Sequence, residues 1–360
     1  MERCNVSLLV EIIYTSDGLL TKYFVYISGE NVSLARAEVN RLTRLSGCHR
    51  GIQWDGRVGL IDCQKNPVPF LLERAALVKE AGIVLFETDV QKDFYENLSD
   101  DIIMDSVKPD ETFSVRTISD RSDFSANDRL VIEADLGEYI KRVLGSKVDL
   151  KNPQVRILVV FTQNSVRVCK SFSSSLRVML RKREPGQKPF FHPSMMNAIL
   201  ARVMCNLVGV TPDETVLDPF CGGGGILCEA SLIGGRVVGI DLNWRLLTGC
   251  RKNLSIVSDD YSIIQGDVRN LPVQVCDCIV TDPPYGRASS TRGAQAIALV
   301  ESLFIRVDSM LRRHEESICI CGASEMKLQD LAEKQGLVVN QVLRIKVHSG
   351  LVRELLILGI

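Results

Sequence analysis

The stretch Thr215-Val216-Leu217-Asp218-Pro219-Phe220-Cys221-Gly222-Gly223-Gly224-Gly225 decides the fold of this chain. Its apolar start predicts a short strand, and the proline and glycines that follow predict a loop before a helix through Ser231. Glycines in such a loop allow positive φ and let the backbone approach a ligand closely. The next helix offers its N-terminus to an anionic group. We therefore expect a strand, a ligand-binding loop and a helix in succession.

The same strand–helix unit recurs through the C-terminal half of the chain. Repeated units of this kind require a parallel sheet with helices on its faces. Two terminal runs, Val338–Val347 and Leu351–Leu358, flank His348-Ser349-Gly350 and predict a closing hairpin with an antiparallel last strand. This combination is typical of the seven-stranded, Rossmann-like methyltransferase architecture rather than of dehydrogenases. The other strands are expected at Val237–Ile240, Ser262–Ile264, Cys278–Thr281 and Ser317–Cys321.

Each of the first four predicted strands of this sheet leads into an acidic residue: Asp218, Asp241, Asp267 and Asp282. The carboxyl ends of parallel strands share one edge, so we expect these carboxylates to line one ligand site. No Gly-Lys-Ser/Thr follows the glycine loop, which excludes a P-loop. Asp241 suits ribose hydroxyls, and Asp267 can accept from an adenine amine. An acid directly before the loop, with Phe220 beside it, favours S-adenosylmethionine over NAD.

The fourth strand runs into Thr281-Asp282-Pro283-Pro284-Tyr285-Gly286. Two prolines cannot continue a strand, because each lacks an N–H and has a fixed φ. The loop therefore presents a carboxylate, a carbonyl and an aromatic ring at the ligand edge. These groups can hold a planar base by its exocyclic amine; the alternative is a Pro-Pro turn that merely ends the strand.

Composition sets the broad class of the protein. The 360 residues are 46% hydrophobic and 24% charged with a net charge of −1, as in ordinary globular proteins. None of the 12 cysteines forms a C-x-x-C pair, and Cys276/Cys278 and Cys319/Cys321 fall inside apolar runs. We expect packed, reduced thiols and no zinc site. No apolar run approaches the ~18 residues of a membrane span, so the expected location is the cytoplasm.

The upstream half divides into two α+β segments, residues 1–90 and 91–172. A basic, proline-containing linker, 173–193, precedes the sheet domain at 194–360. The linker is either a solvated connection or a phosphate-binding segment, and phosphate contact is the stronger interpretation beside an RNA-binding module. The cations expected to bind RNA are Lys170, Arg177, Arg181, Lys182 and Arg183.

The upstream motifs resemble those of the THUMP domain, an RNA-binding module: Phe113-Ser114-Val115-Arg116, Gly137-Glu138-Tyr139-Ile140 and Val148–Pro153. Together with D-P-F-C-G-G-G-G, G-I-D, Q-G-D, D-P-P-Y-G and Pro189-Phe190-Phe191-His192-Pro193, they make the chain similar to the THUMP-containing tRNA guanosine N2-methyltransferases. The resemblance is greatest to the archaeal and eukaryotic type that modifies guanosine 10. The sister type that acts nearer the 5′ end usually carries Asn in place of Asp282. A ferredoxin-like fold is expected for residues 1–90.

This resemblance implies roles for particular residues. Asp282 and the Pro283 carbonyl would accept the two N–H bonds of guanine N2, and Tyr285 would stack on the base. That chemistry needs no metal. S-adenosyl-L-methionine would be bound by His192, Pro193, Asp218, Phe220, Gly222, Gly224, Asp241, Leu242, Asp267 and Val268. The remaining alternatives are an amino-methyltransferase acting on another RNA, on DNA adenine or on protein glutamine, and a non-catalytic RNA-binding protein.

The third strand of the sheet, Tyr261–Gln265, is expected at one edge. Natural proteins usually blunt an exposed edge with Lys, Pro or a bulge, and this strand carries none of these. Either the Ser255–Asp260 segment covers it or a partner adds a strand. The resemblance implies a small zinc-binding activator protein as that partner, with tRNA as the substrate.

Overall fold

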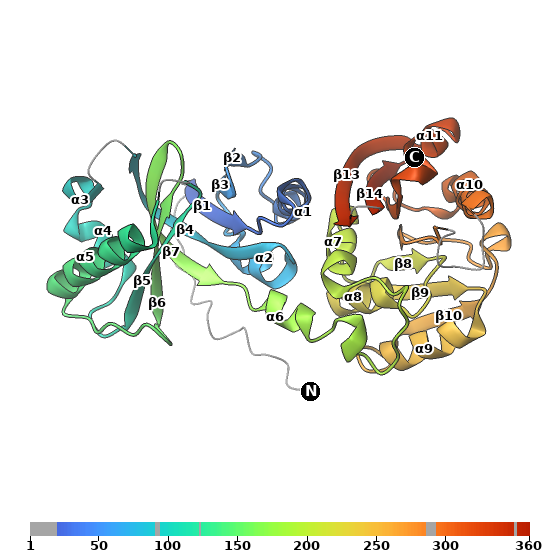
Figure 1. Ribbon diagram of the computed structural model, residues 1–360, viewed down its shortest axis with the longest axis horizontal. Helices are drawn as coiled ribbons and strands as arrows, with labels where there is room; N and C mark the ends of the chain where they lie inside the picture. Colours follow the sequence, from blue (N-terminus) through green and yellow to red (C-terminus); the bar gives the residue numbers. More distant parts are fainter. Residues whose placement is uncertain (1–19, 91–93, 122–123, 286–292, 349–350) are drawn as a thin grey trace. The chain divides into compact units, whose positions relative to one another are not determined.

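The computed structural model describes residues 20–90, 94–121, 124–285, 293–348 and 351–360. It divides into two compact units (Figure 1). The first contains most of the chain up to Ser175. The second contains Leu176–Ile360 together with Ser33–Leu42 and Arg74–Leu77. Gly286, the last residue of the D-P-P-Y-G motif, and two residues of the expected hairpin turn lie outside the described segments.

The first unit is built on a seven-stranded sheet in the order β2-β3-β1-β4-β7-β6-β5. The long strand β4 pairs antiparallel with β1 on one side and with β7 on the other. Strands from before and after residue 91 therefore share one sheet, and the domain boundary drawn there from the sequence stays a prediction. Among the described strands of this sheet, only β5 and β6 are parallel neighbours. The strands are β1 Thr21–Ile27, β2 Gln53–Asp55, β3 Val58–Cys63, β4 Val78–Asp89, β5 Phe113–Ser119, β6 Val155–Phe161 and β7 Ser165–Ser173.

Helix α5, Ala126–Leu144, shows how the sequence sets one element of this unit. Ser125 and Asp128 form a capping box at its start, and Gly145 ends it in the left-handed conformation with φ 71°. Leu136 and Ile140 are buried in the core beside β5 and β6. The other helices of the N-terminal half are α1 Val32–Leu45, α2 Val68–Arg74, α3 Phe94–Asn97 and α4 Asp100–Ser106.

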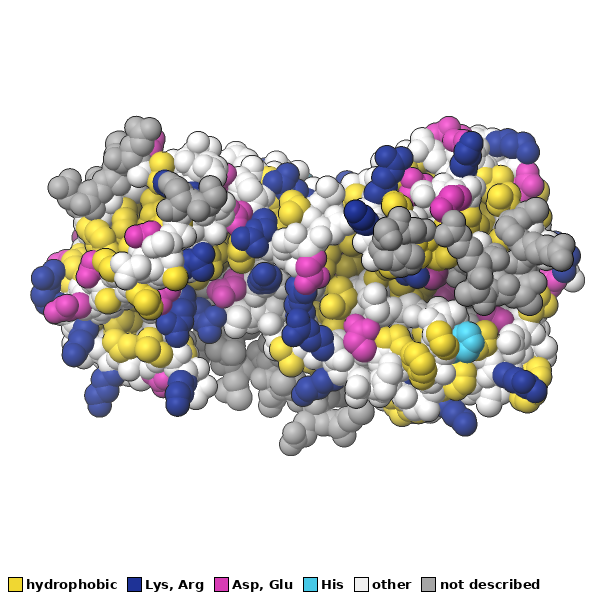
Figure 2. All heavy atoms as spheres, in the orientation of Figure 1, with side chains coloured by type: hydrophobic (Ala, Val, Ile, Leu, Met, Phe, Trp, Pro, Cys, Tyr) yellow, Lys and Arg dark blue, Asp and Glu magenta, His cyan; other side chains and the backbone are white. Residues whose placement is uncertain are grey.

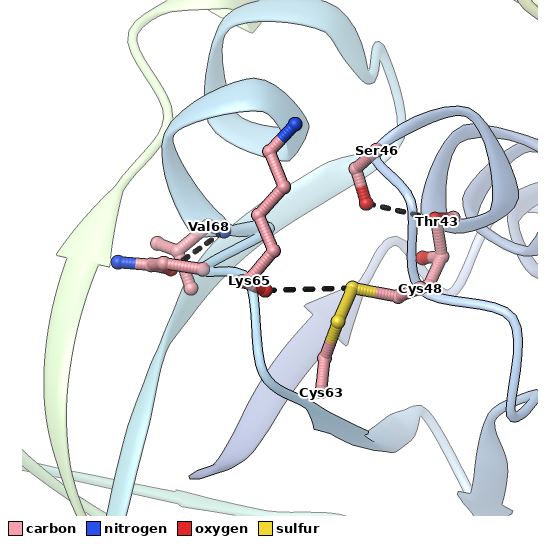
Figure 3. Close-up of a disulfide and its surroundings, with 7 residues drawn as sticks. Thr43, Ser46, Cys48, Cys63, Lys65 and Val68 are labelled. Atoms are coloured by element: carbon pink, nitrogen blue, oxygen red, sulfur yellow. Dashed lines mark hydrogen bonds between the residues drawn. A yellow bond between two sulfur atoms is a disulfide. The ribbon is translucent and has the colours of Figure 1, made fainter. Parts of the chain in front are cut away.

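A disulfide joins Cys48, just after α1, to Cys63 at the end of β3 (Figure 3). The two cysteines lie 15 residues apart and their Cα atoms are 5.6 Å apart. The expectation of reduced, packed thiols is confirmed for Cys276, Cys278, Cys319 and Cys321, which are buried and free. It is wrong for Cys48 and Cys63. Their spacing in the sequence does not show that the fold places the end of β3 beside the residues that follow α1.

The second unit contains the expected seven-stranded sheet, in the order β10-β9-β8-β11-β12-β14-β13. The first five of these strands are parallel neighbours, and β14 pairs antiparallel with both β12 and β13. The chain first moves outward from β8 to β10 and then returns to β11 beside β8. That reversal is the topological switch point, where α/β sheets bind ligands. The strands are β8 Thr215–Asp218, β9 Arg236–Asp241, β10 Tyr261–Gln265, β11 Cys278–Thr281, β12 Ile318–Ala323, β13 Val338–His348 and β14 Leu351–Gly359.

Helices cover both faces of this sheet (Figure 1). Helix α7 is buried over nearly its whole length, whereas α9 buries one side only. None of the helices in the described segments combines the length and the hydropathy that a membrane span requires. The helices of this unit are α6 Leu176–Arg181, α7 Ala198–Val208, α8 Gly225–Ile233, α9 Trp244–Leu254, α10 Gly293–Met310 and α11 Leu328–Lys334, and the short 3₁₀ turns are η2 Pro185–Gln187, η3 Val268–Asn270 and η4 Ser324–Met326.

Candidate active site

The glycine loop after β8 is fixed by the acid that ends β9. Gly222 and Gly224 have φ of 50° and 80°, a conformation that side chains disfavour. The Gly222 N–H donates to Asp241 Oδ2 at 3.0 Å, and the Asn243 N–H donates to Asp241 Oδ1 at 2.8 Å. Asp241 thus holds the loop open beside the strand ends. It retains lone pairs for further donors, since an ionised carboxylate accepts about four bonds.

Three carboxylates meet at the switch point. Asp218 is buried, accepts from the Thr281 hydroxyl at 2.6 Å and accepts from the Phe220 N–H at 3.1 Å. Burial, together with the charges of Asp282 and Asp241, raises the pKa of Asp218 to about 7. Burial also raises the pKa of Asp241. Such a group of acids favours a cationic ligand, because a positive charge offsets their mutual repulsion.

The base side of the site lies at the end of β11. Asp282 is partly buried and accepts a hydrogen bond from the Tyr285 hydroxyl, which also lies 3.3 Å from Cys321 Sγ. Burial raises the pKa of Asp282 to about 6, while the charge of Arg353 opposes that rise. The tyrosine ring packs against the apolar core of the unit, so its expected stacking on a base stays a prediction.

Sequence reasoning missed Arg353. Its guanidinium lies over the Tyr285 ring at 5.5 Å from the centroid, and its Nη1 is 3.8 Å from Met196 Sδ. It reaches the site because β14 pairs antiparallel with β12, opposite Ala323. The available signal was the charged pair Arg353-Glu354 in the otherwise apolar run Leu351–Leu358. The side-chain neighbour of Asp282 on β12, Cys321, gave no such signal.

The third acid of the predicted series is engaged locally. Asp267 forms a two-pronged ion pair with Arg269, which holds the pKa of that carboxyl below its usual range. Its expected bond to an adenine amine would have to compete with this arginine. Val268 is buried in the core, so only its backbone is available to a ligand. Leu242 is 58% exposed directly after Asp241 and is free to pack on one.

The segment Pro189–Pro193, here called the strap, precedes α7. The Nδ1 atom of His192 lies 2.7 Å from the Ser194 hydroxyl. Burial raises the pKa of Asp241, and the electrostatic effect of His192 partly opposes that rise. This places His192 near the acid that fixes the glycine loop. Pro193 is exposed beside it.

The predicted RNA-binding cations fall into two groups. Arg183 donates to both oxygens of the fully buried Glu229, at 2.8 and 3.0 Å, and Lys170 Nζ donates to the Ser106 carbonyl at 3.1 Å. Both side chains are therefore already engaged within the protein, and the expected contact of Arg183 and Lys170 with RNA stays a prediction. Arg181 and Lys182 are exposed, and Arg177 is partly buried. Figure 2 shows Lys and Arg side chains gathered over α6.

The geometry of the loop fits S-adenosylmethionine. A side chain at Gly222 would meet no atom within 4 Å, so space lies open next to the loop. Asp241 has spare acceptor capacity for ribose hydroxyls, and the carboxylates at the switch point suit a sulfonium charge. The donor set therefore matches a cationic adenosine derivative.

Comparisons with known proteins agree with this chemistry. Residues 185–354 match the family described as RMKL-like, methyltransferase domain, and residues 93–169 match the THUMP domain. The tRNA (guanine(10)-N2)-dimethyltransferase of Methanothermobacter thermautotrophicus is 31% identical over 91% of this chain and 96% of its own length. The enzyme of the same name from Pyrococcus abyssi is 28% identical over 92% and 97%. The tRNA (guanine(6)-N2)-methyltransferase of Archaeoglobus fulgidus is 23% identical over 82% and 81%.

The fold is also that of a solved structure. TrmN from Thermus thermophilus aligns with a TM-score of 0.56 at 19% identity, covering 94% of this chain and 99% of that one. The sequence relationship over nearly the full length, the two domain matches and the site geometry lead to one conclusion. The chain belongs to the THUMP-containing, S-adenosylmethionine-dependent tRNA guanine-N2-methyltransferases.

Proposed function

We propose that this enzyme methylates the exocyclic N2 of guanosine 10 in tRNA, in the cytoplasm. The observation that carries the proposal is the Asp282 carboxylate, partly buried at the switch point between β8 and β11. Three relatives named for guanosine 10 share 25–31% identity over at least 91% of this chain. Two relatives named for guanosine 6 match less of the chain, at 23% identity over 82% and 25% identity over 53%.

The residues at the end of β11 account for activation of the amine. The lone pair of guanine N2 is delocalised into the ring, which makes it a weak nucleophile. Asp282 and the Pro283 carbonyl accept its two N–H bonds, localise the lone pair and aim it. The Tyr285 hydroxyl fixes the carboxylate rotamer through its bond to Oδ1. As the new N–C bond formed, the bond from the methyl carbon to the sulfonium sulfur would break and S-adenosylhomocysteine would leave. The carboxylate would stabilise the positive charge that develops on N2 and accept the proton that N2 releases.

The opposite side of the site holds the cofactor. S-adenosylmethionine supplies an electrophilic methyl group on a sulfonium sulfur. When it is bound, Asp241 would accept from its ribose hydroxyls, the backbone of Gly222 and Gly224 would line its site, and His192 and Pro193 of the strap would lie beside it. A guanine stacked in a helix must first leave the stack to reach Asp282.

We assign tRNA contact to the THUMP domain together with Arg181 and Lys182. These two cations are exposed and precede the strap in the sequence, and phosphate contacts there would orient the tRNA without reading its sequence. Arg183 and Lys170 are left out of this set because their charges are paired or buried inside the protein.

Analysis of nucleosides from tRNA methylated with labelled cofactor tests the assignment. N2-methylated or N2,N2-dimethylated guanosine is expected in a wild-type transcript and in one with guanosine 6 replaced. No product is expected when guanosine 10 is replaced. Retained methylation of the guanosine 10-substituted transcript, with loss upon replacing guanosine 6, would assign the enzyme to the sister type.

We also propose a small zinc-binding activator protein at the edge strand β10. The sheet order places β10 at the edge, as expected. One outward group is already used, because Arg251 Nη2 donates to the Ile263 carbonyl at 2.8 Å. A partner strand would displace that bond and pair with the Ile263 N–H, so Ile263→Pro should prevent association. A purified chain that is monodisperse and fully active by itself would contradict the need for this partner.

A further inference from the structure

The buried side-chain amide of Asn253 bonds the strap to α9. Asn253 is 0% exposed, and its Oδ1 accepts from the Phe190 N–H at 2.9 Å. Its Nδ2 donates to the Phe190 carbonyl at 3.0 Å and to the Gly223 carbonyl at 2.9 Å. One side chain therefore bonds to the backbone of two separate segments, the strap and the glycine loop. Both of its N–H donors and its oxygen are used.

The surface of α9 around Asn253 is shaped for the same two segments. Gly249, one turn earlier, faces Phe190, and a Cβ there would lie 2.2 Å from the ring. A Cβ at Gly224 would lie 2.6 Å from Cys250 Sγ. Residues three or four apart lie on one side of a helix, so a single face of α9 receives the strap and the loop.

We infer that Asn253 is a positioning residue for cofactor binding, which sets the distance between the strap and the glycine loop. The inference rests on the proposed role of His192, Pro193 and the loop glycines in holding S-adenosylmethionine. Gly223 lies between Gly222 and Gly224, and Phe190 lies two residues before His192. Moving either backbone away from Asn253 would widen the pocket and remove its preorganisation.

If the role of Asn253 were purely structural, its substitution would lower the stability of the protein without changing the affinity for the cofactor. The chain offers a matched control in Asn206, which is also 0% exposed and also fully bonded. Asn206 donates to Glu38 Oε1 at 2.7 Å and to the Arg74 carbonyl at 3.0 Å, and it accepts from Arg74 Nε at 2.7 Å. All three residues belong to the second unit, and none is assigned to the cofactor pocket.

The test compares Asn253→Asp with Asn206→Asp in the full-length chain. In Asn253→Asp, the new carboxylate would keep the acceptor for the Phe190 N–H but would face two carbonyls without a donor. We expect the KM for S-adenosylmethionine and the Kd for S-adenosylhomocysteine, measured by calorimetry, to rise about 10–100-fold. The kcat at saturating cofactor and the KM for tRNA should change less than about threefold. Asn206→Asp should lower the unfolding temperature but leave both cofactor constants unchanged.

A second variant protects the test from a folding failure. Gly249→Ala pushes on the Phe190 ring and should raise the same two constants, and adding Phe190→Leu should restore part of the affinity by making room. Unchanged cofactor constants in Asn253→Asp or Gly249→Ala, or an equal rise in Asn206→Asp, would overturn the inference. Asp241→Ala serves as the reference. If it too leaves the affinity unchanged, the pocket assignment itself is wrong.

Discussion

The two sides of the active site are held by different kinds of bond. On the cofactor side, backbone N–H groups of Gly222 and Asn243 fix Asp241. On the base side, Asp282 is surrounded by side chains, namely the Tyr285 hydroxyl and the charge of Arg353. Backbone bonds depend on the path of the chain, whereas side-chain bonds disappear with a single substitution. The cofactor side should therefore tolerate changes around its acid better than the base side does.

The largest effect is expected at Asp282. Asp282→Ala should lower kcat by about 10³-fold or more, because the acceptor for the N2 hydrogen and the developing charge is lost. The affinity for S-adenosylmethionine should stay within about threefold of wild type, as calorimetry can check. Asp282→Asn should retain more activity, since one amide oxygen still accepts. Near-normal turnover in Asp282→Ala would remove the distinction between the two sides.

Asp241→Ala should produce the reverse pattern with a smaller magnitude. Loss of charge-assisted bonds to ribose and to the glycine loop should weaken cofactor binding by about 10–100-fold. The kcat at saturating cofactor should fall only a few-fold, because the base side is intact. A large fall in kcat with unchanged cofactor affinity would show that Asp241 serves the chemical step instead.

The pH dependence of kcat tests how strongly the base side depends on the side chains around Asp282. Asp282 must be ionised to take the proton that N2 releases, and its pKa of about 6 predicts that kcat falls as the pH drops through that value. Arg353→Met should move this acid limb upward by about one pH unit, because a nearby positive charge that favours the carboxylate is removed. Asp218, Tyr285 and Cys321 also face Asp282 and remain in place. Arg353→Lys should keep the limb near its wild-type position.

Arg344 provides the control for the pH experiment. It lies on the neighbouring strand β13 and pairs with Glu354. Arg344→Met removes the same charge from the same hairpin and should leave the acid limb unchanged. An equal shift in both variants would show a general electrostatic effect of the hairpin rather than a contact at the base side.

The smallest effect on activity is expected from the exposed cations of α6 and the residue after it, which belong to neither side of the active site. Reversing Arg181 and Lys182 to Glu should weaken tRNA binding and reduce its salt slope by about two, with cofactor constants unchanged. Arg183→Glu should instead destabilise the fold, because it sets a second carboxylate against the buried Glu229. Equal loss of salt dependence in the single Arg183→Glu variant, with unchanged stability, would return Arg183 to the RNA surface.

The sequence could predict the site residues that follow from a local pattern, but not those that depend on distant segments. Asp218, Asp241 and Asp282 could be predicted because each ends, or directly follows, an apolar run that the local sequence identifies as a strand. The sheet order followed from repeated βα units and the closing hairpin. Arg353 and Asn253 act on segments far away in the chain, so their roles depend on strand pairing and helix packing that no local pattern contains.

Two further differences arise from partners that charge patterns do not show. Arg183 stands in a run of cations, and only the packing of α8 reveals that Glu229 is its counter-ion. Asp267 was expected to be open to a ligand, and Arg269, two residues later, occupies it. A cluster of charged residues in a sequence predicts the sign of the charge on a surface. It does not show which of those residues already form ion pairs within the protein.

The position of β14 has a consequence for the order of folding during synthesis. β14 follows β13 in the chain but lies between β12 and β13 in the sheet. β13 therefore cannot join the sheet until the ribosome has made β14, while β8, β9 and the glycine loop already have their neighbours. A nascent chain that ends before Leu351 has the residues that hold the methyl donor but lacks Arg353. The enzyme should thus acquire its cofactor pocket first and its ability to activate a guanine last.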